Sequence, residues 1–164
     1  MKKFILFFIL FFNIHLYADT SERLNSFFRN HLIFTQVSLN SIENEFVESS
    51  GEFKNELDGS ITIEVFSPFK EIYYINKGGI EIHDLEFNQI KKISNQEISK
   101  NSFLSIIQNN FHIDDNSIEI INESSFIIII EDKDYVFNFI NNDLLHVKYK
   151  DNMEINNLIK FSKI

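Results

Sequence analysis

The chain has 164 residues, a formal net charge of −9, 19 phenylalanines and no cysteine. This length suits one domain with a hydrophobic core, and the lack of cysteine excludes a disulfide framework. An acidic chain lacks the basic surface that binding to nucleic acid or to an anionic membrane requires, so the composition argues against both.

The first 18 residues have the pattern of a cleavable export signal. Lys2 and Lys3 precede an apolar run from Phe4 to Phe12, and Ala18 is the small residue expected at a cleavage site. The run is shorter than the roughly 20 apolar residues that span a bilayer, and a retained anchor is the competing interpretation. No cysteine follows Ala18, so the mature N-terminus cannot be acylated as in bacterial lipoproteins. We expect a signal peptide over residues 1–18 and one periplasmic domain over residues 19–164.

The mature chain is predicted to start with a helix over residues 19–32. Leu24, Phe27, Phe28 and Leu32 share one face of such a helix. After it the apolar period changes to two, which is typical of strands. Six strands are predicted at residues 33–39, 51–56, 60–66, 71–76, 79–84 and 88–93.

A second helix is predicted to interrupt the strands. Asn101 or Ser102 is suited to its N-cap, and Phe103, Ile106 and Ile107 lie on one side of it. Five more strands are predicted at residues 117–121, 125–131, 135–140, 144–149 and 154–161. Eleven antiparallel strands joined by short turns have to curl to limit their exposed edges. We therefore expect a mainly β protein with helices (α+β), namely an unclosed antiparallel β-barrel whose open side the helices cover.

The sequence lacks the motifs of an enzyme or a metal site. Four histidines follow the signal, and none has a second ligand at metal-binding spacing: His31, His83, His112 and His146. A nucleophile elbow, a phosphate loop and a dinucleotide-binding turn are all missing. The acidic runs at 114–115 and 131–134 lack the glycine and distal glutamate of a calcium loop, so we interpret them as solvated turns. We expect no catalytic residue, no metal and no cofactor.

A series of short motifs follows in order along the mature chain. It comprises Phe34-Thr35-Gln36, Gly51, Gly59-Ser60-Ile61-Thr62-Ile63, Pro68, Tyr73-Tyr74, Gly79-Ile80-Glu81-Ile82-His83-Asp84, Gln89 and Asn101-Ser102-Phe103-Leu104. In order and spacing this series resembles the LolA family, the periplasmic carriers of outer-membrane lipoproteins in Gram-negative bacteria. The chain departs from the family at Ser67, which stands where the family has an arginine that ties the barrel to its helical lid. It also departs at Glu71 and Tyr73, where the family has phenylalanine and tryptophan.

The resemblance implies a LolA/LolB-like fold, in which a helical lid covers an unclosed barrel, and a carrier that acts as a monomer. Its implied partners are acylated lipoproteins, an inner-membrane lipoprotein-releasing ABC transporter and an outer-membrane acceptor, with no nucleic acid. We assign the lipid-binding cavity wall to Phe34, Ile61, Ile63, Val65, Tyr73, Ile80 and Ile82. We assign the lid to Phe103, Ile106 and Ile107, which leave the cavity when acyl chains enter. Glutamate at position 63 or 82 is expected to leave a folded protein that no longer accepts acyl chains.

Three other functions are compatible with the sequence. The outer-membrane acceptor of such a system shares the fold but is normally a lipoprotein, which the missing cysteine disfavours. A periplasmic β-rich module without lipoprotein transfer would bind either proteins or other lipids. As a protein-binding module it would have a concave face packed solid and would recruit partners at an exposed edge strand. An esterase or glycosidase built from scattered carboxylates would show turnover on its substrate.

Overall fold

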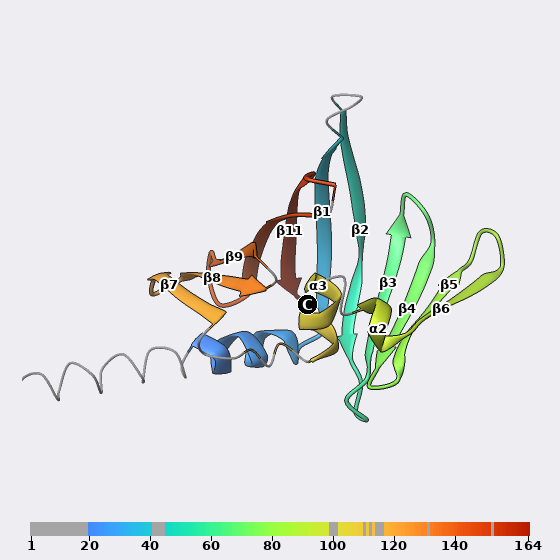
Figure 1. Cartoon of the computed structure of the whole chain (residues 1–164), viewed down its shortest axis with the longest axis horizontal. Helices are drawn as coiled ribbons and strands as arrows, with labels where there is room; N and C mark the ends of the chain where they lie inside the picture. Colours follow the sequence, from blue (N-terminus) through green and yellow to red (C-terminus); the bar gives the residue numbers. More distant parts are fainter. Residues whose placement is uncertain are drawn as a thin grey trace, which may run out of the picture.

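The computed structural model describes residues 20–40, 45–98, 102–109, 111, 113, 117–130, 132–151 and 153–164. The predicted signal peptide over residues 1–18 lies outside these residues, as do His112 and the acidic residues Asp114, Asp115 and Glu131. Within the described residues, eleven antiparallel strands form one sheet that is not closed, and three short helices accompany it. The prediction of a mainly β protein with helices is therefore confirmed at this level (Figure 1).

The helices are the N-terminal helix over residues 20–28, α2 (Asn95–Ile98) and α3 (Ser102–Gln108). The strands, in chain order, are β1 (Leu32–Asn40), β2 (Glu45–Asn55), β3 (Ile61–Ser67), β4 (Glu71–Asn76), β5 (Gly79–Asp84), β6 (Gln89–Ile93), β7 (Ile118–Asn122), β8 (Ser125–Ile130), β9 (Lys133–Phe139), β10 (Leu144–Lys150) and β11 (Asn156–Lys163).

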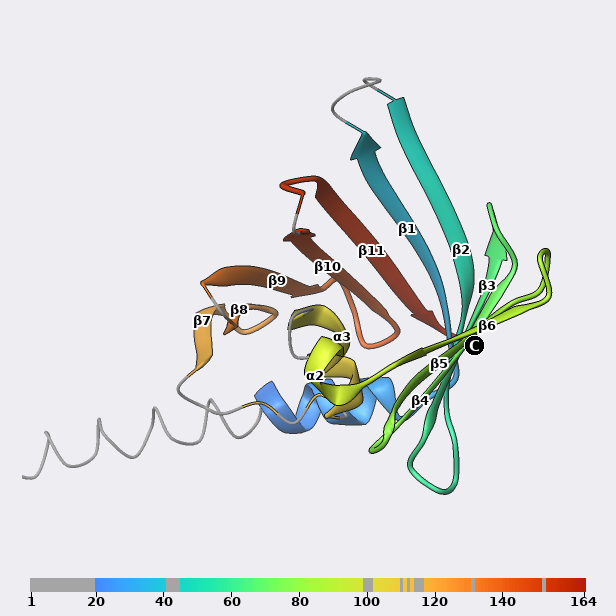
Figure 2. The same ribbon diagram turned by 45° about the vertical axis from the view of Figure 1, so that its right-hand side comes forward.

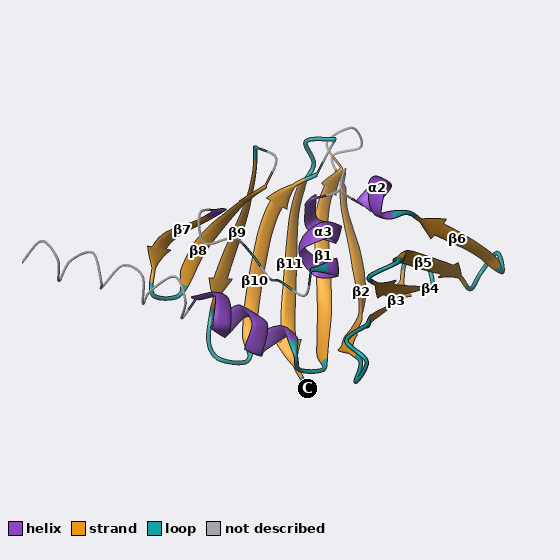
Figure 3. Cartoon of the chain, turned by 60° about the horizontal axis from the view of Figure 1, so that its bottom comes forward, coloured by secondary structure: helices purple, strands orange, loops and turns teal. Residues whose placement is uncertain are grey.

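Two antiparallel meanders, β1–β6 and β7–β11, make up the sheet and join through their first and last strands. The strand order is β6-β5-β4-β3-β2-β1-β11-β10-β9-β8-β7. β1 pairs with β11 from Leu32 opposite Lys163 to Ser38 opposite Asn157. The strands β6 and β7 are consequently the two edges, and α2 and α3 lie in the connection between them. All three helices lie on one side of the curved sheet, which we call the concave face (Figures 2 and 3).

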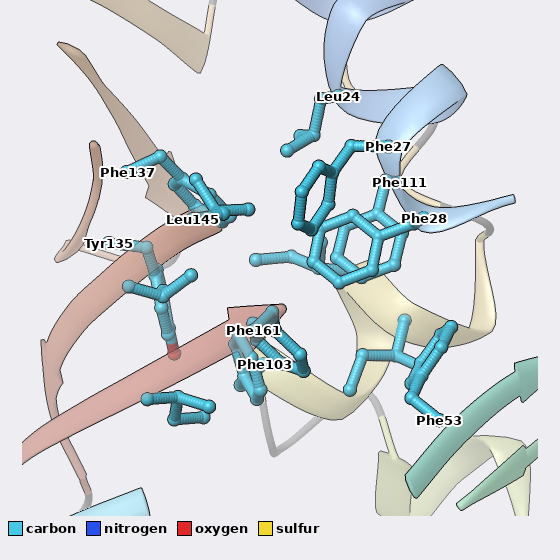
Figure 4. Packing of buried hydrophobic residues seen from close by; sticks show 14 of the residues in the cluster. Leu24, Phe27, Phe28, Phe53, Phe103, Phe111, Tyr135, Phe137, Leu145 and Phe161 are labelled. Atoms are coloured by element: carbon cyan, nitrogen blue, oxygen red, sulfur yellow. The ribbon is translucent and has the colours of Figure 1, made fainter. Parts of the chain in front are cut away.

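Phenylalanine side chains fill the space between the N-terminal helix and the concave face. The ring of Phe28 stacks on that of Phe111, with centroids 3.5 Å apart. It also packs edge-on against Phe53 of β2 and Phe161 of β11, at 5.5 and 5.1 Å. All four side chains are buried (Figure 4). The apolar face that the sequence predicted for this helix therefore attaches it to both halves of the sheet.

The N-terminal helix ends at residue 28, before the predicted end at residue 32, so this boundary was wrong. The side-chain amide of Asn30 donates to the carbonyl oxygens of Ser26 and Phe27, at 2.8 and 3.0 Å. The first bond gives a partner to a carbonyl group of the last helical turn, and the Phe27 carbonyl also accepts the Asn30 backbone N–H at 3.2 Å. Leu32 is fully buried, as its apolar periodicity indicates, but it is the first residue of β1.

Two further differences concern β2 and α2. β2 begins at Glu45, before the predicted start at residue 51, and its first four residues are exposed. Without a buried face they show no apolar alternation, and they are held by pairing with β1, where Phe46 lies opposite Leu39. α2 was not predicted, although its capping box can be recognised in the sequence. The Glu97 carboxylate accepts hydrogen bonds from the Ser94 backbone N–H and hydroxyl, at 3.0 and 2.9 Å.

Gly51 allows β2, β3 and the Phe34 side chain to approach one another closely. A Cβ atom at this position would overlap the carbonyl oxygen of Glu64 and would stand 2.8 Å from the Phe34 ring. The pairing of β2 with β3 also shifts register between Ser50 and Gly51. The missing side chain therefore leaves room for the Phe34 ring on the concave face.

We expect Gly51→Ala to lower the free energy of unfolding by about 1–3 kcal/mol, the usual cost of overpacking. Backbone atoms of Glu64 have to move to accept the methyl group, since a side-chain rotation cannot relieve this overlap. Urea denaturation measures the change. The control is Gly78→Ala, whose new Cβ would meet only the Asn76 side-chain oxygen, at 3.1 Å. Equal losses in the two variants would contradict the explanation.

Candidate functional site

A cavity of about 500 Å³ lies on the concave face beside α3. This volume falls within the roughly 300–1,000 Å³ that is usual for small-molecule sites. Its walls come from β1 to β4, from α3 and from β9 to β11, so both meanders contribute. Most of the lining side chains are apolar.

One wall of the cavity is formed by β3 and β4. Ile63 and Val65 of β3 lie opposite Tyr73 and Glu71 of β4, and all four side chains line the cavity. Residues that face each other in an antiparallel pair point to the same side of the sheet. The alternation in Ile61-Thr62-Ile63-Glu64-Val65, recognised in the sequence, is therefore what places an apolar row in this wall.

The floor of the cavity is formed where β1 meets β11. Phe34 lies opposite Phe161 and Gln36 lies opposite Ile159, and these residues all line the cavity. The rings of Phe34 and Phe161 are 6.1 Å apart between centroids. Gly51 lies opposite Phe34 on the other neighbouring strand. Because Gly51 has no side chain, the Phe34 ring occupies that space.

The helix α3 covers part of the cavity with Phe103, Leu104 and Ile107. The Phe103 ring stacks on Tyr149 of β10, with centroids 5.0 Å apart and planes inclined by 11°. It also stacks on Tyr135 of β9, with centroids 5.8 Å apart. The contacts described here between α3 and the second meander are thus aromatic and dispersive, and they hold no charge pair.

Tyr73 and Glu71 are the polar side chains of the β4 wall. The Tyr73 hydroxyl donates to Glu71 Oε2 at 2.6 Å. Burial, together with this hydrogen bond, raises the pKa of Tyr73 above the ordinary value of 10, so the phenol remains a donor at neutral pH. On the side formed by the second meander, Lys133 and Asp151 also line the cavity.

A small polar network bounds the cavity beyond Gln36. The side-chain oxygen of Asn157 accepts hydrogen bonds from Ser38 Oγ at 2.6 Å and from Gln36 Nε2 at 3.0 Å. The Asn157 amide donates to the carbonyl oxygen of Ile155 at 2.9 Å. Asn157 is only 6% exposed, and these bonds satisfy its buried polar atoms. The apolar part of the cavity therefore ends at this network.

Helix α3 is also linked by hydrogen bonds to α2 and to the turn between β4 and β5. Gln108 Nε2 donates to the carbonyl oxygen of Asn76 at 2.9 Å and to Asn95 Oδ1 at 2.8 Å. Asn95 in turn donates to the carbonyl oxygen of Lys77 at 3.0 Å. We call these three side-chain hydrogen bonds the helix clasp. They tie the end of α3 to the first meander.

We expect Gln108→Ala to increase the opening of α3 about fivefold, the effect of losing about 1 kcal/mol of hydrogen bonding. Two bonds of the clasp disappear, whereas the packing of Phe103 and Ile107 remains. Hydrogen exchange of the backbone amides of residues 102–109 measures this opening. Gln89→Ala, on the edge strand β6, is the control and should leave the exchange unchanged. Unaltered exchange in Gln108→Ala would show that the clasp does not restrain the helix.

The structure brings together part of the site that the sequence predicted. The predicted residues that line the cavity are Phe34, Ile63, Val65, Tyr73, Phe103 and Ile107. The predicted residues outside its lining are Ile61, Ile80, Ile82 and Ile106. Three of these four, Ile61, Ile80 and Ile106, are only 2% exposed and belong to the packed core, while Ile82 is half-buried against that core. Alternation identifies the face of a strand, but it does not distinguish core from cavity along that face.

Several lining residues were not predicted from the sequence. They are contributed mainly by the second meander, namely by Tyr135, Tyr149, Ile159 and Phe161. Their alternating apolar pattern was recognised, but only the pairing of β11 with β1 shows that they face the same space as Phe34. Glu71 was noted only as a departure from the LolA pattern.

Neither a cluster of metal-ligating side chains nor a membrane-spanning helix occurs in the part of the chain that the structure describes. No group of three or more histidine, aspartate or glutamate side chains gathers there into an arrangement suited to a metal ion. Two histidines pair with carboxylates near the surface, His31 with Glu52 at 2.9 Å and His83 with Glu81 at 2.6 Å. In the same part of the chain, no helix has the length and apolar character needed to cross a membrane.

Comparisons with known proteins identify no family for this chain. No protein-family model matches it, and no curated protein sequence shows significant similarity to it. The resemblance to the LolA family therefore stays a prediction, and the functional argument rests on the cavity.

Proposed function

We propose that this protein is a periplasmic carrier that binds the acyl chains of lipoproteins in the cavity on its concave face. The observation that supports this proposal most strongly is an apolar cavity that reaches the surface. Ile63, Val65 and Ile159 line its interior, whereas Phe69 and Met153 line it and are 60% and 75% exposed. A flexible apolar chain can therefore enter without unfolding of the sheet.

The energetics of such a ligand suit a carrier. Each methylene group removed from water contributes about 0.8 kcal/mol, so a long acyl chain binds strongly to an apolar wall. Release of the chain into water is unfavourable for the same reason. The carrier has to deliver its cargo directly from its own cavity to a second apolar site.

Helix α3 is the proposed lid. It is seven residues long, and it covers the cavity with Phe103, Leu104 and Ile107. In the empty protein these side chains occupy space beside the wall, and in the loaded protein acyl chains replace them there. The equilibrium between the two positions shifts because the ligand contacts one of them more favourably than the other.

The identity of the cargo and of the partners rests on the resemblance to the LolA family. The open sheet with helices on its concave face agrees with the fold that this resemblance implies. The proposed partners are an inner-membrane lipoprotein-releasing ABC transporter and an outer-membrane acceptor. The export signal predicted over residues 1–18 would deliver the carrier to the periplasm between them.

Binding of a synthetic triacylated lipopeptide tests the proposal. The protein is incubated with fluorescently labelled lipopeptide, and the soluble complex is separated by size-exclusion chromatography. We expect the triacylated peptide to co-elute with the protein, and the same peptide without acyl chains to elute alone. Retention of both peptides would favour a peptide-binding module, and retention of neither would contradict the carrier function. Extraction of the exported protein and mass spectrometry of its bound lipid provide an independent check.

A further inference from the structure

The charged side chains of the cavity are distributed unevenly between its two halves. Lys133 and Asp151 line the part formed by the second meander, and their formal charges cancel. Glu71 is the charged residue among the lining residues of the first meander. Glu71 has two neighbours across the strands, Val65 on β3 and Asp84 on β5, so one of the two is a second acid. The β4 wall therefore presents negative charge to a ligand.

After the hydrogen bonds around Glu71 are formed, the groups of this wall that remain available to a ligand are hydrogen-bond acceptors. A carboxylate only accepts hydrogen bonds, and the single O–H group of Tyr73 is already donated to Glu71 Oε2. The Gln36 amide nitrogen donates to Ser38 and Asn157, so both its hydrogens are engaged. Ser49 also lines the cavity, and because its hydroxyl can donate or accept a hydrogen bond, it does not discriminate between charged and uncharged ligands.

We propose that Glu71 selects acyl ligands with an uncharged or cationic, hydrogen-bond-donating head group over ligands with an anionic head group. This inference rests on the proposed binding of acyl chains and specifies the chemical class of ligand. The apolar wall of Ile63 and Val65 binds the chain in every case, and the wall next to it repels a carboxylate or phosphate. An acylglycerol hydroxyl or an N-acyl amide N–H instead donates to the free lone pairs of Glu71. Free fatty acids, which share the chain but carry a carboxylate, are disfavoured.

Competition binding tests the selectivity with ligands that share one chain. A fluorescent palmitoyl amide is the reporter, and 1-monopalmitin, hexadecylamine and palmitic acid, which all carry a 16-carbon chain, compete with it at neutral pH below their aggregation concentrations. For the wild type we expect 1-monopalmitin and hexadecylamine to bind at least about tenfold more tightly than palmitic acid, a difference of about 1.4 kcal/mol. In Glu71→Gln the ratio of the affinity for 1-monopalmitin to the affinity for palmitic acid should fall toward one, mainly because palmitic acid binds more tightly.

Two variants distinguish the effect of the Glu71 charge from the effect of a change in structure. Glu71→Gln keeps the size of the side chain and an oxygen that accepts from Tyr73, so thermal unfolding should change little. Glu48→Gln is the matched control, because Glu48 is exposed on β2 and lies outside the cavity lining. It should keep the wild-type ratio.

Each outcome bears on one of the two proposals. Binding of the reporter with equal competition by all three lipids, or an unchanged ratio in Glu71→Gln, overturns the role of Glu71 and leaves acyl binding standing. A preference of the wild type for palmitic acid also overturns it. No binding of the reporter or of any competitor overturns the proposed function itself.

Discussion

Replacing Ile63 with glutamate should weaken binding of a palmitoyl amide probe at least about 100-fold, a loss of about 2.8 kcal/mol. Ile63 lies in the middle of the β3–β4 wall, between Ile61 and Val65 on the same face and opposite Tyr73. An acyl chain against this position would have to remove water from the new carboxylate, which is costly without a partner. It would also lose the apolar contact that each methylene makes with the isoleucine. Fluorescence titration with the probe measures the change.

The variant should still fold, because its side chain can be hydrated while the cavity is empty. Ile63 is only partly buried. The matched control is Ile33→Glu, which places the same substitution on β1 but on the opposite face, where Ile33 is 47% exposed. It should bind the probe as the wild type does. Ile82→Glu should lose less affinity for the probe than Ile63→Glu does, because Ile82 lies outside the cavity lining. Undiminished binding by Ile63→Glu would refute the assignment of this cavity.

Phe28→Ala should produce the largest loss of stability, about 3–5 kcal/mol in the free energy of unfolding. The Phe28 ring is 1% exposed and contacts Phe53, Phe111 and Phe161. Those partners come from β2, from the segment after α3 and from β11, so one ring joins the N-terminal helix to both meanders (Figure 4). Removing it leaves a cavity that rigid neighbours fill only in part. A domain of this size is stable by about 5–15 kcal/mol, and the loss is a large share of that.

Urea denaturation compares Phe28→Ala with Phe46→Ala, whose side chain is 73% exposed and whose loss should cost less than about 0.5 kcal/mol. Phe28→Leu keeps most of the volume and should fall between the two. Phe28→Ala should also speed hydrogen exchange in α3, because Phe111 loses its stacking partner just beyond that helix. Similar stabilities for Phe28→Ala and Phe46→Ala would contradict this account of the core.

The strands were predictable from sequence wherever one face is buried. β4 and β5 have the predicted bounds, 71–76 and 79–84, because their alternation is regular and turn residues flank them. The start of β2 was missed since its residues are exposed on both faces, and the pairing that forms it comes from β1. α2 was missed although Ser94 and Glu97 stand at capping-box spacing, because four residues carry too little periodicity to be recognised.

The candidate site was only partly predictable. Ile61 and Ile63 lie on the same face of β3, yet Ile63 lines the cavity and Ile61 lies in the core. The difference depends on which side chains lie over each position. The tyrosines of β9 and β10 were missed for a similar reason, since nothing in their own segments indicates that they face Ile63. Glu71 could have been found, because it lies two residues before Tyr73 on β4 and therefore on the same face.

By itself the sequence determined most of the strands, their apolar faces and the two amphipathic helices, because the spacing of apolar residues along each segment predicts them. The tertiary structure decided that β1 pairs with β11, which brings Phe34 beside Phe161 and leaves β6 and β7 as edges. Such a pairing is chosen by the apolar surface that two distant segments bury together. Periodicity within either segment does not reveal its partner, and the cavity exists only where the two meanders meet.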